Sequence, residues 1–350
     1  MGPSSNEKSK LESLTIDWLR FPMAALIVLL HTGALGLDSS QPIYRSLSII
    51  TNAGICRLAV PCFFFISGYL FFSKLEEWDW HIWTGKLKSR IKTLFIPYLL
   101  WNIIAALVIY GYRQLRAPLE GREYLSFIEH INNWGGWWDA GVSFDGPLWF
   151  IRELMLLCIL APLIFWILRH LGLYWLILCG LASLWFGQPI DGILYFSAGS
   201  YLRLYGKGLL NTFNRYRTIT YILSPLLLAL ILLYFDQQRL YLIFRGLFII
   251  AGIIASFNLV SCGLEHGCLK VHPLLSKSGF FIFAAHNILI LHDISHSIVL
   301  HMIPIRWGEL YNCIDLFLRP TFAIGICLGL YWTMSKLTPR TLRLLTGGRI

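Results

Sequence analysis

The chain has 350 residues, of which 56% are hydrophobic and 14% charged, and its mean hydropathy is +0.62. Soluble domains carry roughly 25% charged residues, so this composition excludes an ordinary soluble globular protein. The net charge of +10 fits a protein face on anionic lipid and requires no nucleic-acid partner.

Apolar runs of membrane-spanning length recur along the chain and predict an all-α, polytopic integral membrane bundle of about ten transmembrane helices. The first run is too long for the apolar region of a signal peptide and lacks a small-residue cleavage site, so we expect an uncleaved helix. The expected domains are a polar cytoplasmic segment 1–13, a membrane domain 14–335 and a basic cytoplasmic tail 336–350. The expected spans are 14–36, 53–73, 93–111, 147–168, 172–186, 193–206, 218–235, 240–260, 273–293 and 313–335.

The distribution of basic residues predicts the orientation of this bundle. If the N-terminus is cytoplasmic, 18 of the 29 Lys and Arg residues fall in inward-facing segments and six in outward-facing ones. Because inward-facing loops carry the excess of positive charge, both termini are expected in the cytoplasm.

Two ionisable side chains, Arg20 and His31, lie within the first span. On a helix their separation corresponds to ~16 Å along the axis. Such groups are rare in membrane helices and usually functional. Asp17 lies three residues before Arg20, so two interpretations stay open: a local ion pair, or an arginine that guides the thioester end of an acyl donor.

Other charged residues within the spans share one depth in the expected bundle. Because isolated charges at that depth are costly, we expect them to face a polar chamber in the outer half of the bundle. The alternative for Arg57 and Arg245 is that their side chains extend to the lipid headgroups. The full set is Arg57, Arg152, Glu153, Arg245, Arg319, His31 and His286.

Basic residues alternate in the expected cytoplasmic loop between the second and third spans. They offer charge for the phosphates of a coenzyme A-like donor. Binding of lipid headgroups is the alternative. The four residues are Lys86, Lys88, Arg90 and Lys92.

Two further patterns lie in connecting segments. Trp134, Trp137 and Trp138 in the long outward segment could stack on sugar rings, although tryptophan also populates membrane interfaces. A Cys/His cluster does not match zinc-finger spacing, so no metal is expected. Its members are Cys262, His266, Cys268 and His272.

The buried residues suit acyl transfer from a thioester to an alcohol. That reaction needs a base for the hydroxyl proton and a cation for the developing oxyanion. His31 can be the base, and Arg57 or Arg152 the cation; Glu153 can orient a base or hold Arg152. Alternatively, His31 only hydrogen-bonds across helices.

The ordered motifs resemble membrane acyltransferase family 3. Asp17, Arg20 and His31 match the opening of that family, and the resemblance covers nearly the whole chain. Lys86, Lys88, Arg90 and Lys92 depart from it, because many relatives carry paired arginines before the third span. The further matching strings are Arg57-Leu-Ala-Val-Pro61-Cys-Phe-Phe-Phe-Ile-Ser67-Gly68-Tyr69, Arg90 with Pro97-Tyr98, Gly146-Pro147-Leu148-Trp149-Phe150-Ile-Arg152-Glu153 and Phe280-Phe281-Ile-Phe283-Ala-Ala-His286.

The resemblance implies a ten-helix, multi-pass enzyme of the bacterial cytoplasmic (inner) membrane. It would move an acyl group, commonly acetyl from acetyl-CoA, to a hydroxyl of a carbohydrate or lipid-linked acceptor of the cell envelope. Some relatives append an esterase-like domain, which this sequence lacks, so a second step would need a partner protein. The sequence does not distinguish a monomer from a homo-oligomer. The implied catalytic residues are His31, Arg20, Arg57, Arg152, Glu153 and His286.

A transporter or flippase for an anionic envelope precursor is the alternative function, because buried Arg and His could bind a phosphate or carboxylate in transit. Transporters usually contain internal repeats, and the two halves of this chain show no convincing self-similarity.

Overall fold

The computed structural model describes residues 5–32, 40–73, 75, 77–119, 121, 123–124, 126–133, 144–186, 188–206 and 208–349. Within these residues the secondary structure is helical and contains no strand, which confirms the predicted all-α class. The expected Trp134, Trp137 and Trp138 surface lies outside the described residues.

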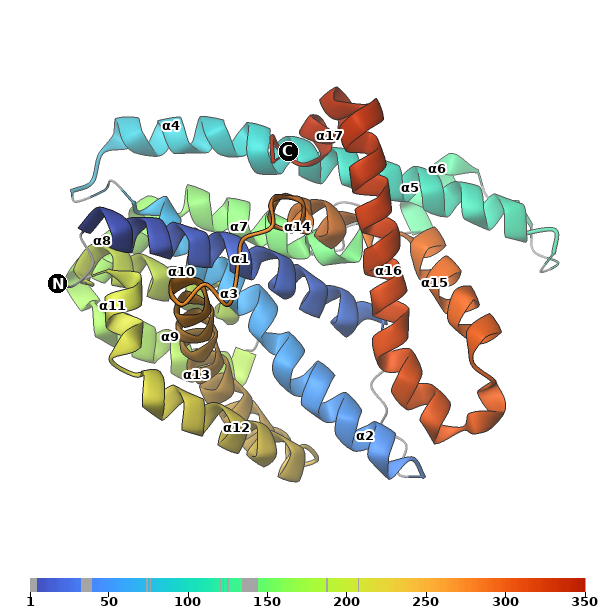
Figure 1. Cartoon of the computed structure of the whole chain (residues 1–350). Coiled ribbons are helices and arrows are strands. Elements are labelled where there is room, and N and C mark those ends of the chain that lie inside the picture. Colours follow the sequence, from blue (N-terminus) through green and yellow to red (C-terminus); the bar gives the residue numbers. More distant parts are fainter. Residues whose placement is uncertain are drawn as a thin grey trace.

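The first half of the chain contributes the helices that carry most of the candidate residues (Figure 1). Its elements are α1 (Ser5–Thr32), α2 (Pro42–Ser48), η1 (Ile49–Gly54), η2 (Ile55–Leu58), α3 (Ala59–Phe71), α4 (Trp80–Arg90), η3 (Ile91–Phe95), α5 (Ile96–Arg116), α6 (Phe127–Asn133), η4 (Gly146–Leu148), α7 (Trp149–Ile159) and α8 (Ala161–Leu171).

The second half packs around α1, which contacts α13, α14 and α16 (Figure 1). Its elements are α9 (Leu173–Phe186), α10 (Gln188–Tyr205), α11 (Leu209–Asn214), α12 (Arg217–Leu233), α13 (Gln238–Glu265), α14 (Pro273–Ala285), α15 (Leu289–Met302), η5 (Ile305–Trp307), α16 (Glu309–Leu337) and α17 (Pro339–Leu345).

Five helical segments of the described chain are long and apolar enough to cross a membrane. A sixth is possible if the bent pair Gly146–Ile159 and Ala161–Leu171 forms one span. The helices near the other expected spans include α9, α12 and α14, which are apolar but only 14, 17 and 13 residues long. The structure therefore supports a membrane-spanning bundle, with fewer full-length spans than the predicted ten.

Two expected spans are broken in the structure. The helix axis turns by 66° between α7 and α8, next to Pro162 in the first turn of α8, where a proline is tolerated but cannot continue the preceding helix. The expected span 273–293 is interrupted after α14, so His286 lies at a helix end instead of mid-helix.

Glycines allow α3 and α10 to approach closely. A Cβ on Gly68 would lie 2.0 Å from the carbonyl oxygen of Phe196, and one on Gly199 would lie 2.0 Å from that of Phe65. Backbone atoms cannot yield as a flexible side chain can, so only glycine fits at both positions. Small residues at helix interfaces are the usual means of close packing in membranes.

The C-terminal segment folds back on α5 rather than extending away from the bundle (Figure 1). Leu342 and Leu345 of α17 are buried, and the indole Nε1 of Trp101 donates a hydrogen bond to the carbonyl oxygen of Leu345 over 3.0 Å. This packing brings the last residues of the described chain beside η3.

Candidate active site

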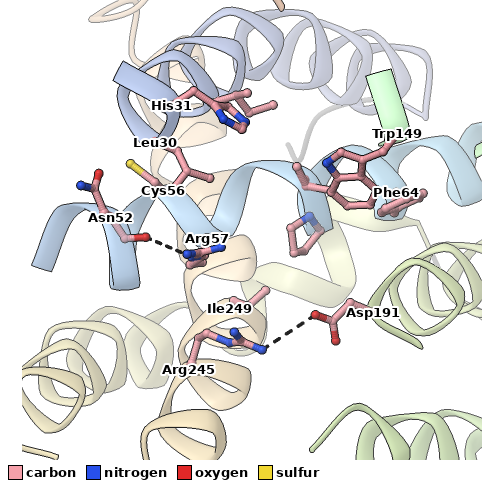
Figure 2. A pocket seen from close by; sticks show the side chains of 13 residues that line it. Leu30, His31, Asn52, Cys56, Arg57, Phe64, Trp149, Asp191, Arg245 and Ile249 are labelled. Carbon is pink, nitrogen blue, oxygen red and sulfur yellow. Dashed lines mark hydrogen bonds and ion pairs between the residues drawn. The ribbon is translucent and has the colours of Figure 1, made fainter. Parts of the chain in front are cut away.

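A cavity of about 290 Å³ lies at the C-terminal end of α1, and we call it the His31 cavity. Figure 2 shows His31 above Arg57, with Arg245 and Asp191 on the opposite side. It therefore joins a titratable ring, two cations and a carboxylate from four helical elements, α1, η2, α13 and α10. Its lining residues are Ile27, Leu30, His31, Asn52, Cys56, Arg57, Val60, Pro61, Phe64, Trp149, Asp191, Arg245 and Ile249.

Irregular helical turns place Asn52 and Arg57 on the wall of this cavity. The backbone changes from a π-helical turn in η1 to a tighter 3₁₀ turn in η2, which departs from regular α-helical hydrogen bonding. The Nε of Arg57 donates to the carbonyl oxygen of Asn52 over 3.1 Å (Figure 2). Insertions of this kind frequently occur at functional sites, because they re-aim side chains within an otherwise regular helix.

Asn52 is fully buried and lines the cavity. Neither its side-chain oxygen nor its side-chain nitrogen has a hydrogen-bond partner among the described residues. A buried amide without partners costs free energy, and it can both accept from and donate to a polar ligand. The sequence analysis missed this residue, whose only signal was a polar side chain at the edge of an apolar span.

His31 and His286 meet although 255 positions separate them in the sequence. Their ring centroids lie 5.4 Å apart and the rings are tilted by 43°. His31 remains accessible even though protein atoms surround much of its ring. The pair confirms that the first and ninth expected spans converge.

The hydrogen bonds of His286 define its tautomer. Its Nδ1 lies 2.7 Å from the carbonyl oxygen of Phe283 and 3.2 Å from that of Ile282. Because carbonyl oxygens only accept, Nδ1 carries the proton, and Nε2 of the neutral ring is an acceptor. A buried His286 with this tautomer can orient a neighbouring donor.

Asp191 and Arg245 form a loose ion pair on the side of the cavity opposite His31, with 4.0 Å between Oδ2 and a guanidinium nitrogen (Figure 2). The Ser183 hydroxyl donates to the other carboxylate oxygen. Glu153 lies close by, since a Cβ on Gly192 would be 3.2 Å from its Oε2. The predicted Arg245 and Glu153 thus gather around Asp191, which the sequence analysis did not identify.

The remaining predicted charges have other surroundings. Arg319 pairs with Asp315, its Nε donating over 3.0 Å, and also donates to the carbonyl oxygen of Thr32 over 3.3 Å. Arg319 therefore contacts the residue that follows His31, and its charge is neutralised by Asp315 on its own helix. Arg152 is half-buried on α7 and does not line the His31 cavity.

A second cavity, of about 150 Å³, lies nearer the N-terminal end of α1, and we call it the Arg20 cavity. Among the described residues, its lining contains three arginines, Arg20, Arg90 and Arg349, and no acidic residue. Arg20 also pairs with Asp17 over 2.7 Å, as expected for the local ion pair. The strongly positive lining suits an anion. The apolar and small lining residues are Phe63, Ile66, Ser67, Leu70, Leu94, Phe150, Ile151, Leu154, Ser276, Gly279, Phe280 and Phe283.

Only Arg90 of the four predicted donor-binding cations lines this cavity. The expected loop is instead helical in α4 and η3. Asp79 caps the N-terminus of α4, where its carboxylate accepts from the backbone nitrogens of His81 and Ile82. On a helix, residues two positions apart do not share a face, so alternating cations diverge.

The other three cations have separate environments. The Nζ of Lys86 donates to the carbonyl oxygen of Ser73 over 2.9 Å and to that of Phe71, at the end of α3. Lys88 and Lys92 are exposed. Their placement suits contact with lipid headgroups or solvent more than a shared site with Arg90.

Aromatic rings separate the two cavities. Phe64 lines the His31 cavity and packs edge-on against Phe150 of the Arg20 cavity, with ring centroids 4.7 Å apart. Phe150 also contacts Phe63 and Phe283, at 5.9 Å in each case. The partition is therefore made of side chains and not of backbone.

Asp145, at the start of η4, is a buried carboxyl that the sequence analysis did not single out. It is 2% exposed, and its backbone nitrogen donates to the side-chain oxygen of Asn102 over 3.4 Å. Burial raises the pKa of Asp145 to about 8, so at neutral pH the group is mostly protonated. The neighbouring Asn287 directly follows His286, which connects this carboxyl to the end of α14.

The Cys/His cluster after α13 forms local contacts. The Sγ of Cys262 lies 3.6 Å from Nδ1 of His266. Within the part of the chain that the structure describes, no three or more His, Cys, Asp or Glu side chains are arranged to hold a metal ion.

Comparison with known proteins identifies the class of enzyme. Residues 14–338 match the acyltransferase 3 family, whose defining unit is described as an acyltransferase domain. The chain belongs to this family. The acyltransferase is also 27% identical to the succinoglycan biosynthesis protein ExoH of Rhizobium meliloti (strain 1021) over 322 residues, covering 87% of this chain and 82% of that protein. No solved structure matches it significantly.

The match confirms the family resemblance and establishes that this protein is an acyltransferase. It favours group transfer over the alternative of a transporter or flippase. The His31 and Arg20 cavities both lie within the matched residues, except for Arg349, which lies beyond them.

Proposed function

We propose that this acyltransferase moves an acyl group, commonly acetyl, from acyl-CoA to a hydroxyl of a cell-envelope carbohydrate. The observation that carries the proposal is the His31 cavity, which groups a base, a cation and an unpaired amide. These are the groups that alcohol attack on a thioester requires.

His31 is the general base. Its imidazole takes the proton of the acceptor hydroxyl while the alcohol oxygen forms a bond to the thioester carbonyl carbon. The tetrahedral intermediate then collapses, the carbon–sulfur bond breaks and the thiolate leaves. The imidazolium returns the proton to that sulfur, so the products are an ester and the free thiol of coenzyme A.

Arg57 stabilises the oxyanion that develops on the thioester oxygen. The hydrogen bond from its Nε to Asn52 holds the guanidinium against the cavity wall and leaves its terminal nitrogens for substrate. The Asn52 amide hydrogen-bonds the acceptor hydroxyl or a neighbouring sugar hydroxyl. His286 positions the His31 ring, while Glu153 and Asp191 balance the charge of Arg152 and Arg245.

The donor binds from the Arg20 cavity. Arg20 and Arg90 contact its phosphates, because guanidinium groups bind phosphate oxygens in a bidentate manner. Arg20 and His31 are ~16 Å apart along α1, so an extended pantetheine arm can connect the two cavities. The arm passes the ring partition of Phe64 and Phe150 to deliver the thioester to His31.

The relative named for succinoglycan biosynthesis supports a carbohydrate acceptor, because succinoglycan is a polysaccharide. Sugar hydroxyls are the acceptor groups, and the accessible His31 ring lies at the cavity that receives them. The acceptor is lipid-linked or polymeric and enters from the side of the bundle opposite the Arg20 cavity.

The enzyme lies in the bacterial inner membrane with both termini in the cytoplasm. The excess of Lys and Arg in the expected inward segments supports this orientation. The shorter apolar helices α9, α12 and α14 supply further crossings toward the expected ten. The Arg20 cavity then faces the compartment that contains acyl-CoA.

Release of thiol from acetyl-CoA by the purified protein tests the proposal. With a polysaccharide acceptor fraction present, we expect thiol release to accompany incorporation of labelled acetyl into carbohydrate. Binding of acetyl-CoA without thioester cleavage, in the presence of envelope acceptors from the source cells, would contradict it.

A further inference from the structure

The C-terminal segment after α17 turns back and brings Arg349 to the Arg20 cavity. α17 is anchored by the hydrogen bond from Trp101 to Leu345, and the Tyr331 hydroxyl donates to the carbonyl oxygen of Arg349 over 3.4 Å. Both sides of the turn are therefore fixed to the bundle. Arg349 is the last residue of the described chain, and its side chain is half-buried.

Two glycines make this turn possible. Gly347 and Gly348 have φ values of +62° and +88°, a region that favours glycine. A Cβ on Gly347 would lie 2.4 Å from the carbonyl oxygen of Thr93, so the segment passes directly over η3. Thr93 follows Arg90 by three residues, and the close approach thus brings two arginines to one cavity.

Among the described residues, the Arg349 guanidinium contacts an aromatic ring and a carbonyl oxygen. It stacks over the Phe280 ring at 4.6 Å, and one of its terminal nitrogens donates to the carbonyl oxygen of Thr346 over 3.1 Å. Among the described residues, no carboxylate lies within 4.0 Å of Arg349 or Arg90. The three guanidinium groups share the cavity, and Asp17 pairs with one of them, Arg20.

The positive charges of Arg20 and Arg90 repel the Arg349 guanidinium of the C-terminal segment. Burial and the positive charges of Arg20 and Arg90 lower the pKa of Arg349 to about 10. The Arg349 guanidinium is still protonated at neutral pH. Its placement beside Arg20 and Arg90 therefore costs free energy, which a bound anion would offset.

We propose that Arg349 is a third donor-binding residue, which joins Arg20 and Arg90 in contacting the diphosphate of the coenzyme A donor. The C-terminal segment then forms one wall of the donor site. This inference rests on the proposed function, because it assumes a coenzyme A donor. It assigns a binding role to a residue beyond the part of the chain that matches the family.

Titration calorimetry of the full-length protein in detergent with coenzyme A tests the inference. Arg349→Ala should weaken the affinity on the order of tenfold, because it removes a charge-assisted hydrogen bond. Arg349→Lys should lose less, since it keeps the charge but not the planar fork. The matched control is Arg343→Ala, an exposed arginine of the same segment that lines neither cavity and should bind as the parental protein does.

Two further measurements extend this test. One separates the position of Arg349 from its charge, and the other separates the diphosphate of coenzyme A from its 3′-phosphate. Gly347→Ala keeps Arg349 but displaces the segment from Thr93, and it should weaken the affinity in the same direction. With 3′-dephospho-CoA, which retains the diphosphate, Arg349→Ala should show the same loss as with coenzyme A. A loss that disappears with this probe would overturn the assignment to the diphosphate.

These measurements distinguish failure of the proposed coenzyme A donor from failure of the proposed role of Arg349. A parental protein that does not bind coenzyme A would overturn both the proposed donor and this inference. A parental protein that binds it while Arg349→Ala binds equally well would overturn the inference alone. A drop in melting temperature of Arg349→Ala with unchanged affinity would likewise assign Arg349 a purely structural contact with Phe280.

Discussion

The two cavities on α1 differ in the kind of side chains that they gather. Within the part of the chain that the structure describes, the His31 cavity holds a histidine, a carboxylate, two arginines and an unpaired amide, whereas the Arg20 cavity holds three arginines and no acid. Mixed groups that can exchange protons suit a reaction, and concentrated positive charge suits an anion. The difference assigns chemistry to one end of the helix and donor binding to the other.

Substitution of His31 should have the largest effect on catalysis and should leave donor binding unchanged. His31→Ala should lower the rate of acyl transfer by about 10²-fold to 10⁴-fold, the range for a positioned general base. Coenzyme A affinity should be unchanged, because the Arg20 cavity is untouched. His301→Ala, at an exposed histidine of α15, is the matched control and should retain the parental rate.

The pH dependence sharpens this assignment. Because protonation of His31 blocks proton abstraction, the parental rate should fall as the pH falls through the pKa of this group. A folded His31→Ala protein that transfers acyl groups at the parental rate would limit His31 to its contact with His286.

Arg57 should carry the next largest effect. Arg57→Gln removes the charge next to the developing oxyanion and should lower kcat by about 10²-fold to 10³-fold. Arg57→Lys should retain part of the rate, because it keeps the charge while losing the bond to Asn52. Steady-state kinetics of thiol release measure both; a change in KM alone would place Arg57 in substrate binding instead.

Gly199 tests whether the walls of the His31 cavity depend on close helix packing. Gly199→Ala would place a Cβ 2.0 Å from the Phe65 carbonyl oxygen and should destabilise the protein by about 1–3 kcal/mol. Because α10 also carries Asp191, activity should fall with stability. Thermal unfolding in detergent measures the effect.

Gly180→Ala is the matched control for this substitution. A Cβ at Gly180 meets nothing within 4 Å, and alanine favours the helix, so stability should stay the same or rise slightly. Equal melting temperatures for the two variants would contradict the close packing of α3 and α10.

The smallest expected effect concerns two cations of η3 and its flank. Arg90→Gln should weaken coenzyme A binding on the order of tenfold, because Arg90 lines the Arg20 cavity. Lys92→Gln should change the affinity little, because Lys92 is exposed. Calorimetry at low salt compares the two, and equal losses would indicate a diffuse basic surface rather than a cavity.

The sequence predicted the helical class and the convergence of several buried charges, and it left the Asp17–Arg20 pair open as one of two interpretations. Those predictions depend on hydropathy and on helix spacing, which act over short stretches of chain. The meeting of His31 with His286 required tertiary packing, although their common expected depth was a correct signal.

Other features had no signal in local spacing. The irregular turns of η1 and η2 that aim Asn52 and Arg57 do not follow a helical period. Helix formation at 80–95 separated four cations that alternate in sequence. Arg349 reaches Arg20 only through the turn at Gly347 and Gly348, and the sequence analysis treated that segment as an exposed basic tail.

The central claim is that donor binding and chemistry occupy separate cavities, and the kinetics of two variants test it most directly. Acetyl-CoA should be titrated in a thiol-release assay with His31→Gln, Arg90→Gln and the parental protein at one saturating acceptor concentration. We expect His31→Gln to lose kcat with little change in KM for acetyl-CoA. We expect Arg90→Gln to raise that KM, while kcat largely recovers at high donor concentration. Equal changes in both parameters for the two variants would contradict the separation of the cavities.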